Sequence, residues 1–261
     1  MSLAPPFRQE PVNSFGDTRL LMAARNNDLE GVKKLIAEGT DAAAANLQGK
    51  TALHHASLHG NIGMMSLLLE HGASVNAKTE CGSTPLQHAV FQRRHEAVEL
   101  LFTHGALADI ADNKERTPLH WAAAGEDYAM AKILLSHGAN PNAVGDDEKE
   151  TPLISSCRKG QGRIVPALLV GNADPNIPDM HGATALHHAA LLHNPSLCEL
   201  FIKHGANPAL QDNGGFTACS RWPEVEAIHQ RVREKARASL IAENHARMKK
   251  IAAARPWRPS L

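Results

Sequence analysis

Apolar and polar residues follow one another in this chain with the spacing of short helices, and segment 117–142 shows the pattern in full. Thr117 and Pro118 favour the start of a helix, because a threonine side chain accepts a hydrogen bond from a first-turn amide and proline has no amide that needs a partner. Three alanines follow, and their small side chains allow a neighbouring helix to lie close. Gly125 ends this first predicted helix.

A second helix is predicted after Gly125, with Ala129, Ile133 and Leu134 on one face at helical spacing. Gly138 then supplies the left-handed residue that commonly ends a helix, and residues 139–142 lead into an extended loop. A pair of helices this short cannot bury its apolar face alone. The unit therefore needs copies of itself beside it.

Copies of this unit recur at a nearly constant period. Each copy opens with a threonine that is followed two residues later by an apolar residue or cysteine, at Thr18, Thr51, Thr84, Thr117, Thr151, Thr184 and Thr217. Because a period of about 33 residues opened by T-P-L-H is the signature of ankyrin repeats, the chain resembles that family over about residues 16–220. The resemblance implies an all-α solenoid of about seven helix-turn-helix repeats, joined by β-hairpin loops.

The repeats divide the chain into three parts. Residues 1–15 hold three prolines and no periodicity, which predicts a flexible leader, and residues 16–220 form the predicted array. Within the array the fifth repeat is irregular, because Ser155-Ser156-Cys157 replaces a small apolar triplet and Pro166 falls inside the expected second helix. Proline removes a backbone hydrogen bond there, so we expect a kink or a late start to that helix.

Residues 221–261 form the third part, a basic C-terminal capping helix and tail. The pattern after Pro223 predicts one helix to about Ala254, whose first half packs on the last repeat. This part holds ten basic and four acidic residues, a net charge of +6, so the rest of a chain with zero net charge carries −6. A solvated cap helix is the favoured interpretation, and a partner-binding helix of the calmodulin-target kind comes second. Nucleic acid or an anionic membrane comes third, because no phenylalanine, tyrosine or tryptophan is interleaved between Pro223 and Trp257.

The cysteines and the lack of targeting signals indicate a reducing compartment. The four cysteines form no C-x-x-C pair and fall in different repeats, which favours free thiols. The start of the sequence lacks a signal-peptide pattern, and no apolar run is long enough to cross a membrane. We therefore expect a cytoplasmic or nuclear protein.

The sixteen histidines are the first candidates for metal ligands. His54, His120 and His187, however, share one repeat position, at which the family resemblance implies that the imidazole bonds to the hairpin backbone. Repeat-equivalent positions are spread along the array and do not converge on one ion. The sequence predicts no metal and no cofactor.

No catalytic motif is found. The G-x-S-x-G, H-E-x-x-H, phosphate-loop and dinucleotide-binding patterns are all missing from the sequence. Cys157 beside Arg158 offers a nucleophile, but no base follows at a predictable spacing, and a weakened helix is the favoured interpretation. The chain is predicted not to be an enzyme.

A partner-binding surface is the better hypothesis. The resemblance implies a concave face lined by hairpin tips and by the exposed ends of the first helices. The candidates on that face are Leu58, His59, Phe91, Gln92, Arg158, Lys159, Met180, Leu191 and Leu192. Phe91 is the first anchor, since aromatic residues tend to dominate interface energies, and Leu58 is expected beside it. The alternative is that hairpins or the tail cover these apolar side chains.

These observations predict a non-catalytic scaffold or adaptor that binds another protein through the concave face. The alternative is a regulator that acts through the basic helix on calmodulin, an anionic membrane or nucleic acid, with the array as a spacer. An enzyme dependent on Cys157 is a remote third. By resemblance, Asn76, Asn142 and Asn176 occupy a position that asparaginyl hydroxylases modify in some family members, although a purely structural asparagine is favoured.

Overall fold

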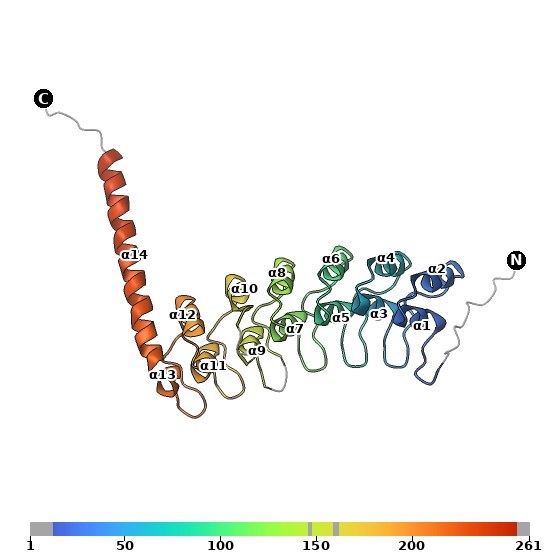
Figure 1. Cartoon of the computed structure of the whole chain (residues 1–261), viewed down its shortest axis with the longest axis horizontal. Helices are drawn as coiled ribbons and strands as arrows, with labels where there is room; N and C mark the ends of the chain where they lie inside the picture. Colours follow the sequence, from blue (N-terminus) through green and yellow to red (C-terminus); the bar gives the residue numbers. More distant parts are fainter. Residues whose placement is uncertain (1–12, 146–147, 159–161, 255–261) are drawn as a thin grey trace.

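The computed structural model describes residues 13–145, 148–158 and 162–254, which form an elongated array of helices (Figure 1). Lys159 and most of the predicted leader lie outside the described residues. The helices within the described part are α1 (Arg19–Arg25), α2 (Leu29–Ala37), α3 (Ala52–His59), α4 (Ile62–Glu70), α5 (Pro85–Phe91), α6 (His95–Thr103), α7 (Pro118–Ala124), α8 (Tyr128–Ser136), α9 (Pro152–Arg158), α10 (Val165–Val170), α11 (Ala185–Leu191), α12 (Pro195–Lys203), α13 (Ala218–Arg221) and α14 (Glu224–Ala254).

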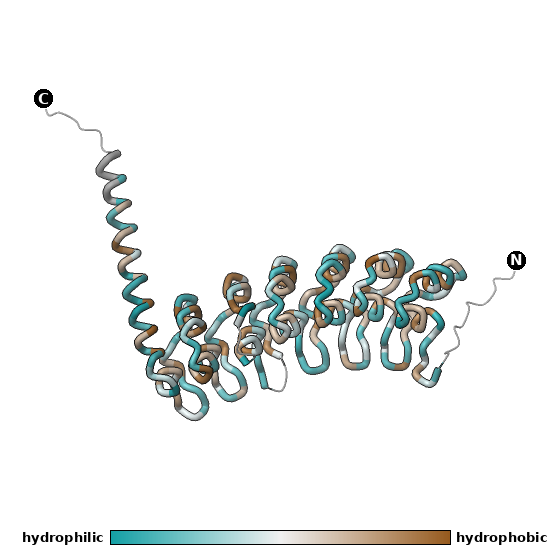
Figure 2. The backbone as a smooth tube through the Cα atoms, in the orientation of Figure 1, coloured by the Kyte–Doolittle hydropathy of each residue, from teal (hydrophilic) through white to brown (hydrophobic). Residues whose placement is uncertain are grey.

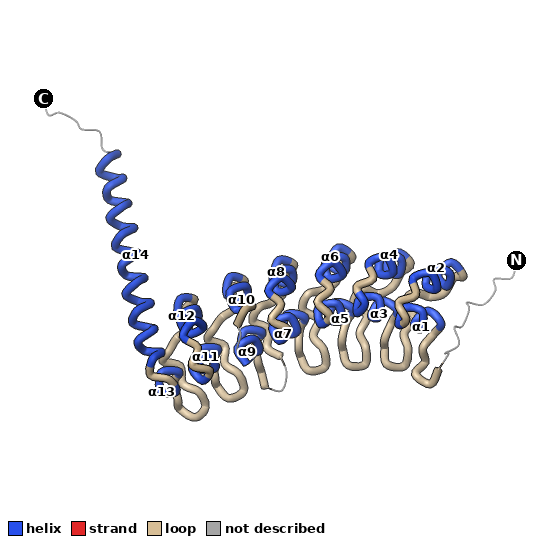
Figure 3. Tube along the Cα trace, in the orientation of Figure 1, coloured by secondary structure: helices blue, strands red, loops and turns tan. Residues whose placement is uncertain are grey.

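The helices form two layers, as the predicted solenoid requires. The odd-numbered helices from α1 to α13 are the first helices of seven repeats and lie in one layer, and the even-numbered helices from α2 to α12 are the second helices and lie in the other. Loops project from the layer of first helices between successive repeats (Figure 3). The expected β-hairpins are minimal: in the described residues they amount to isolated bridges such as the one between Ala45 and Thr51, with no continuous strand.

The threonine that opens each repeat starts its first helix by the predicted mechanism. In the third repeat the Thr84 hydroxyl accepts a hydrogen bond from the Gln87 amide (3.3 Å), and the Gln87 side chain accepts one from the Thr84 amide (2.9 Å). This reciprocal capping box satisfies two amides that would otherwise lack partners. The same box uses a histidine at the third helical position after Thr51, Thr117 and Thr184.

Leucine, alanine and methionine side chains form a continuous core between the layers and between neighbouring repeats. In α8 the buried residues are Met130, Ala131 and Leu134, whereas Ala129 is exposed. Ala129 was grouped with Ile133 and Leu134 on one apolar face, but it is exposed and lies outside the buried stripe of α8. The last turn of this second helix ends as predicted, with Gly138 at a φ of +82°.

The irregular fifth repeat starts its second helix late. In the regular repeats that helix begins eleven residues after the opening threonine, which would place it at residue 162 in this repeat. α10 instead begins at Val165 and has six residues, with Pro166 in its first turn, where a missing amide is harmless. The expected late start is confirmed.

α14 caps the array with its first turns and then leaves it. Val225 and Ile228 are buried and Val232 is half-buried, whereas every side chain from residue 233 to residue 247 is exposed. The helix continues well past α12 (Figure 1), with its apolar residues scattered among hydrophilic ones (Figure 2). No helix within the described ranges is long and apolar enough to cross a membrane.

Candidate partner-binding surface

The hairpin loops and the adjoining side of the first helices form a surface that we call the inner face. Side chains four and seven residues after each opening threonine lie on it, for example Trp121 and Ala124 in the fourth repeat. Since each repeat contributes the same two positions, the residue types that occupy them determine the chemistry of the face along the array.

An aromatic pair lies at the centre of the inner face. The Phe91 side chain is 60% exposed, and its ring lies edge-on to the ring of Trp121, with 5.4 Å between centroids and an interplanar angle of 90°. The Arg116 guanidinium lies 4.1 Å from the centroid of the Trp121 ring. Arg116 is in turn held by the buried carboxylate of Asp112 at 2.9 Å. These contacts fix the ring of Trp121 while leaving Phe91 open to a partner.

A hollow of about 370 Å³ adjoins the aromatic pair. The residues that line it come from the fourth and fifth repeats and include Arg116, Trp121, Ala124, Glu150, Ser155 and Arg158. Ala124 occupies the position that Phe91 and Leu191 hold in their repeats, so the missing bulk of its side chain opens this hollow.

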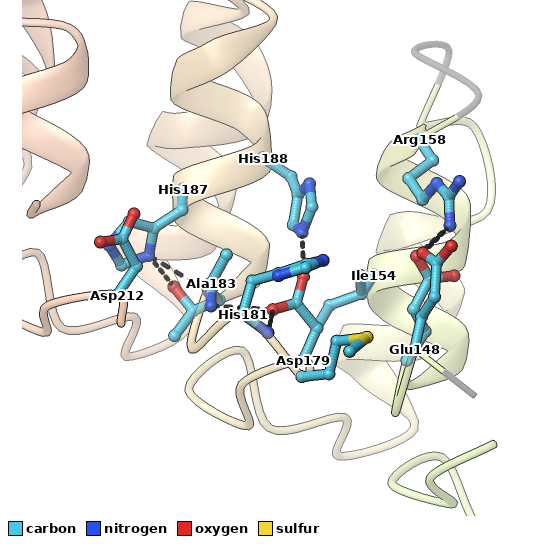
Figure 4. Close-up of polar contacts among 12 residues, drawn as sticks. Glu148, Ile154, Arg158, Asp179, His181, Ala183, His187, His188 and Asp212 are labelled. Atoms are coloured by element: carbon cyan, nitrogen blue, oxygen red, sulfur yellow. Dashed lines mark hydrogen bonds and ion pairs between the residues drawn. The ribbon is translucent and has the colours of Figure 1, made fainter. Parts of the chain in front are cut away.

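An ion-pair network forms the far wall of the hollow. Arg158 pairs with Glu148 (Figure 4) and also with Glu150, whose Oε1 lies 2.6 Å from the Arg158 Nη1. The Glu150 side chain is only 6% exposed and also accepts a hydrogen bond from the Ser155 hydroxyl (3.2 Å). A buried carboxylate requires such partners, because burial without them would carry a large desolvation cost. Arg158 is therefore exposed as predicted but already engaged within the chain.

Buried aspartates hold further basic side chains on the inner face. Asp179 accepts hydrogen bonds from the amides of His181 and Ala183 and pairs with His188 at 2.8 Å (Figure 4). Asp212 pairs in the same way with Arg221, whose hydrogen bond lowers the pKa of Asp212 to about 2. Asp179 and Asp212 thus each hold one side chain of the inner face in place.

The structure places the predicted site residues unevenly. Gln92 is exposed, but Leu58 and His59 are only partly exposed, and the His59 Nε2 lies 2.9 Å from the carbonyl oxygen of Arg25. The ring that packs on Phe91 is Trp121 of the next repeat and not a residue of the preceding one. Met180, Leu191 and Leu192 are exposed by 47%, 63% and 44%, which makes them a second apolar area toward the C-terminal end.

Trp121 is the functional candidate that sequence reasoning missed. The signal was available as a column four residues after each opening threonine, which holds Met22, His55, His88, Trp121, Ser155, His188 and Arg221. This column did not indicate an exposed ring, because a tryptophan beside three alanines is typical of a core position. Only the packing of α7 on its neighbours leaves this ring half exposed.

The buried histidines tie neighbouring repeats together, as the resemblance implied. The His54 Nδ1 accepts a hydrogen bond from the Thr51 amide (3.1 Å), and its Nε2 donates one to the Ser83 carbonyl of the next hairpin (3.1 Å). Burial lowers the pKa of His54 to about 3. Gln87 makes the equivalent tie to Arg116 in the third repeat.

No group of three or more potential ligands in the described residues could hold a metal ion. All four cysteines are free, and Cys157 and Cys198 are buried. Burial raises the pKa of the Cys157 thiol to about 12, which disfavours the thiolate form. Cys157 is also 0% exposed, so its sulfur does not reach the surface.

The three asparagines singled out by resemblance form bridges between loops. The Asn142 side chain donates to the carbonyl of Asn172 (3.2 Å) and accepts from the amide of Asp174 (2.7 Å). Asn76 and Asn176 make the same two bonds to their own neighbours. Hydroxylation at these positions stays a prediction, and each side chain already has a structural role.

Comparison with known proteins places this geometry in a family. A family model for ankyrin repeats (three copies) aligns with residues 5–79, 75–145 and 143–212, most of the chain. The chain belongs to the ankyrin-repeat family. Ankyrin repeats are generally protein–protein interaction modules, and the resemblance drawn from the repeat period is confirmed.

Solved ankyrin domains share the architecture. The ankyrin repeat domain of Bcl-3, a member of the IkappaB protein family, superimposes with a TM-score of 0.74 at 25% identity over 82% of this chain and 99% of that one. The human ASB11 ankyrin repeat domain gives a TM-score of 0.69 at 28% identity, over 83% of this chain and 96% of that one.

Curated relatives match over short stretches only. The ADP-ribosylation factor GTPase-activating protein AGD4 of Arabidopsis thaliana is 36% identical over 73 residues, which are 28% of this chain and 9% of that protein. Neurogenic locus notch homolog protein 2 of Homo sapiens is 43% identical over 63 residues, 24% of this chain and 2% of that protein. The similarity to these much longer proteins is therefore limited to a small part of their length.

Proposed function

We propose that this ankyrin-repeat protein is a non-catalytic adaptor that binds another protein through its inner face. The observation that carries the proposal is the exposed Phe91 ring, held edge-on against Trp121 beside a preformed hollow. Aromatic side chains that are fixed before binding lose little conformational entropy when a partner covers them. They are the residues that most often dominate binding energy at interfaces.

The remainder of the inner face supports an interface of ordinary size. The aromatic pair, the hollow and the apolar area at Met180 and Leu191 lie on successive repeats. A stable interface buries about 800 Å² on each partner, an area that several adjacent repeats supply. Free cysteines fit a cytoplasmic or nuclear setting, where the partner would be met.

Quantitative capture from a cell lysate tests the proposal with three baits: the full chain, Phe91→Ala with Trp121→Ala, and Tyr128→Ala. Tyr128 is a matched control, since it is an aromatic residue 46% exposed on a second helix, away from the inner face. We expect partners of the full chain to be kept by the control and lost by the double variant. Binding of a purified partner should weaken by about 2 kcal/mol or more, roughly thirtyfold.

Two results would count against the inner face. Partners that the Phe91 and Trp121 variant retains at full strength would show that the aromatic pair is not an anchor. Partners that are lost only when α14 is cut after Leu240 would move the function to the basic helix. Circular dichroism of each bait confirms that the array is folded before the captures are compared.

A further inference from the structure

A second hollow, of about 490 Å³, lies where α14 diverges from α12. Its apolar floor combines the end of α12 and the loop after it with one side of α14. Ile202 and Ala206 are 8% and 6% exposed, and Val232 is half-buried, while Ala236 is exposed at the open end. We call this feature the α12–α14 wedge. It exists because α13 has only four residues, after which the chain continues directly into a long helix that crosses α12 and does not run beside it.

The rim of the wedge is basic. Lys203, Arg233 and Lys235 line it and are all exposed. A single carboxylate, that of Glu199, serves two of them: its Oε1 lies 2.8 Å from the Lys203 Nζ and 3.8 Å from the Lys235 Nζ. Two ammonium groups and a guanidinium around one carboxylate leave the rim with a positive charge.

The helix beyond the wedge extends this basic surface. Residues 231–250 hold seven basic and two acidic residues, and Leu240 and Ile241 are 58% and 48% exposed. Arg233 and Arg237 are one turn apart, a spacing at which like charges destabilise a helix. A projecting helix also lacks the packing that normally stabilises helices in proteins. A negatively charged partner would offset the repulsion and supply the packing.

We propose that the α12–α14 wedge binds an acidic, amphipathic segment of another protein. The apolar side chains of that segment would lie on Ile202, Ala206 and Val232, and its carboxylates would pair with Lys203, Arg233 and Lys235. An apolar floor inside a basic rim is complementary in shape and in charge to such a segment. The site is separate from the inner face, so the proposal does not rest on the adaptor function.

Two features favour a protein segment over other anions. A helix that lies on a membrane surface needs several large apolar side chains along one face, whereas Leu240 and Ile241 are the only large apolar residues in the sequence of residues 233–247. Single-stranded nucleic acid is usually held by aromatic stacking, and no aromatic residue occurs in the sequence of α14. The wedge itself is concave, which suits individual apolar side chains.

Fluorescence anisotropy with the full chain tests the proposal near physiological salt. The probe is a labelled 16-residue helical peptide of glutamate and leucine, and its comparison is the same peptide with every leucine replaced by serine. We expect the leucine peptide to bind at least tenfold more tightly, since only it fills the floor. Ala236→Glu, and Arg233→Glu with Lys235→Glu, should each weaken this binding at least tenfold. Both changes are on exposed positions, so the array stays folded.

The controls separate the wedge from general charge and from the inner face. Arg247→Glu makes the same kind of charge reversal farther along α14 and should change binding less than threefold, and Phe91→Ala should leave it unaltered. Equal binding of the two peptides, or no binding of the leucine peptide, would overturn the proposal. Tighter binding to phosphatidylserine vesicles or to a 20-base oligonucleotide than to the leucine peptide would also overturn it, in favour of those ligands.

Discussion

Replacing His54 by glutamine should remove part of the acid sensitivity of this array. Burial lowers the pKa of His54 to about 3 from an ordinary 6.5, and its Nδ1 faces the Thr51 amide, a donor that leaves no place for a second proton. The folded pKa lies below the unfolded one. The stability contributed by the neutral imidazole is therefore complete above pH 6.5 and is lost as the pH falls from 6.5 toward 3.

The size of the effect follows from proton linkage. For each proton that only the unfolded chain binds, the free energy of unfolding falls by about 1.4 kcal/mol per pH unit below 6.5. Lowering the pH to 5 should therefore reduce it by about 2 kcal/mol through His54 alone. His88, whose pKa burial lowers to about 4, adds a similar loss. His55, where burial and then the charges of Lys50 and Arg25 lower the pKa to about 4, adds a smaller one because it is partly exposed.

Glutamine is the appropriate replacement because the chain already uses it at the equivalent position. Gln87 accepts from the Thr84 amide at 2.9 Å and donates to the Arg116 carbonyl at 2.8 Å, as His54 does toward Thr51 and Ser83. At pH 7 we expect His54→Gln to change the free energy of unfolding by less than about 1 kcal/mol. Between pH 7 and pH 5 it should lose about 2 kcal/mol less than the original chain.

Urea unfolding at several pH values between 7 and 5 measures the slope, with circular dichroism and tryptophan fluorescence compared to verify a single transition. His71→Gln, the same exchange at an exposed histidine after α4, is the matched control and should leave the slope unaltered. An unchanged slope for His54→Gln would refute the reasoning. So would a His54 imidazole that titrates near pH 6.5 in NMR spectra of the folded protein.

Three further predictions concern single contacts. Asp109→Asn should stabilise the array by about 1 kcal/mol. Asp109 accepts a hydrogen bond from the Asn140 amide but cannot donate one, whereas the equivalent Asn76 accepts from Leu107 and also donates to the Gly105 carbonyl. A urea titration in which the reverse change, Asn76→Asp, leaves the free energy of unfolding unaltered would contradict this. Arg158→Ala should lower the free energy of unfolding by about 1–2 kcal/mol, because it removes the arginine that pairs with the buried Glu150 carboxylate. Glu148→Gln removes only the more exposed pair and should lower it by less than about 1 kcal/mol. Equal losses in urea unfolding would contradict the argument from burial. Truncation after Ala238 should leave the thermal midpoint within about 2 °C of the full chain, because the side chains of the removed residues 239–247 are exposed. A larger drop in calorimetry would reveal a contact between the removed part of α14 and the array.

Most of the fold could be predicted because its determinants are local. Each opening threonine caps a helix a few residues away, and glycines at a left-handed φ such as Gly72, Gly105 and Gly138 follow the ends of second helices, so the sequence period translates directly into repeat boundaries. The late start of α10 followed from Pro166 by the same local logic. The exposure of Ala129 could not be predicted from local signals, because it depends on which helices pack against α8.

The candidate site was harder to predict because it depends on pairs of repeats. Phe91 was predicted to be an anchor from its position in the repeat, yet the ring that packs on it, Trp121, belongs to the following repeat and becomes a neighbour only when α5 packs beside α7. Arg158 was expected to be available, but the fold brings Glu148 and Glu150 against it. The residue pattern within one repeat does not predict contacts between side chains of neighbouring repeats.

The sequence by itself determined the number of repeats, their helices and the basic character of the C-terminal helix. These features depend on capping groups, glycine conformations and charge counts within a few residues. Only the tertiary structure decided which side chains meet across repeats, where Ala124 opens a hollow, and how α14 diverges from α12 to form a wedge. The physical reason is that packing sets the spacing and angle between successive units, and these relations arise between residues that the chain holds far apart.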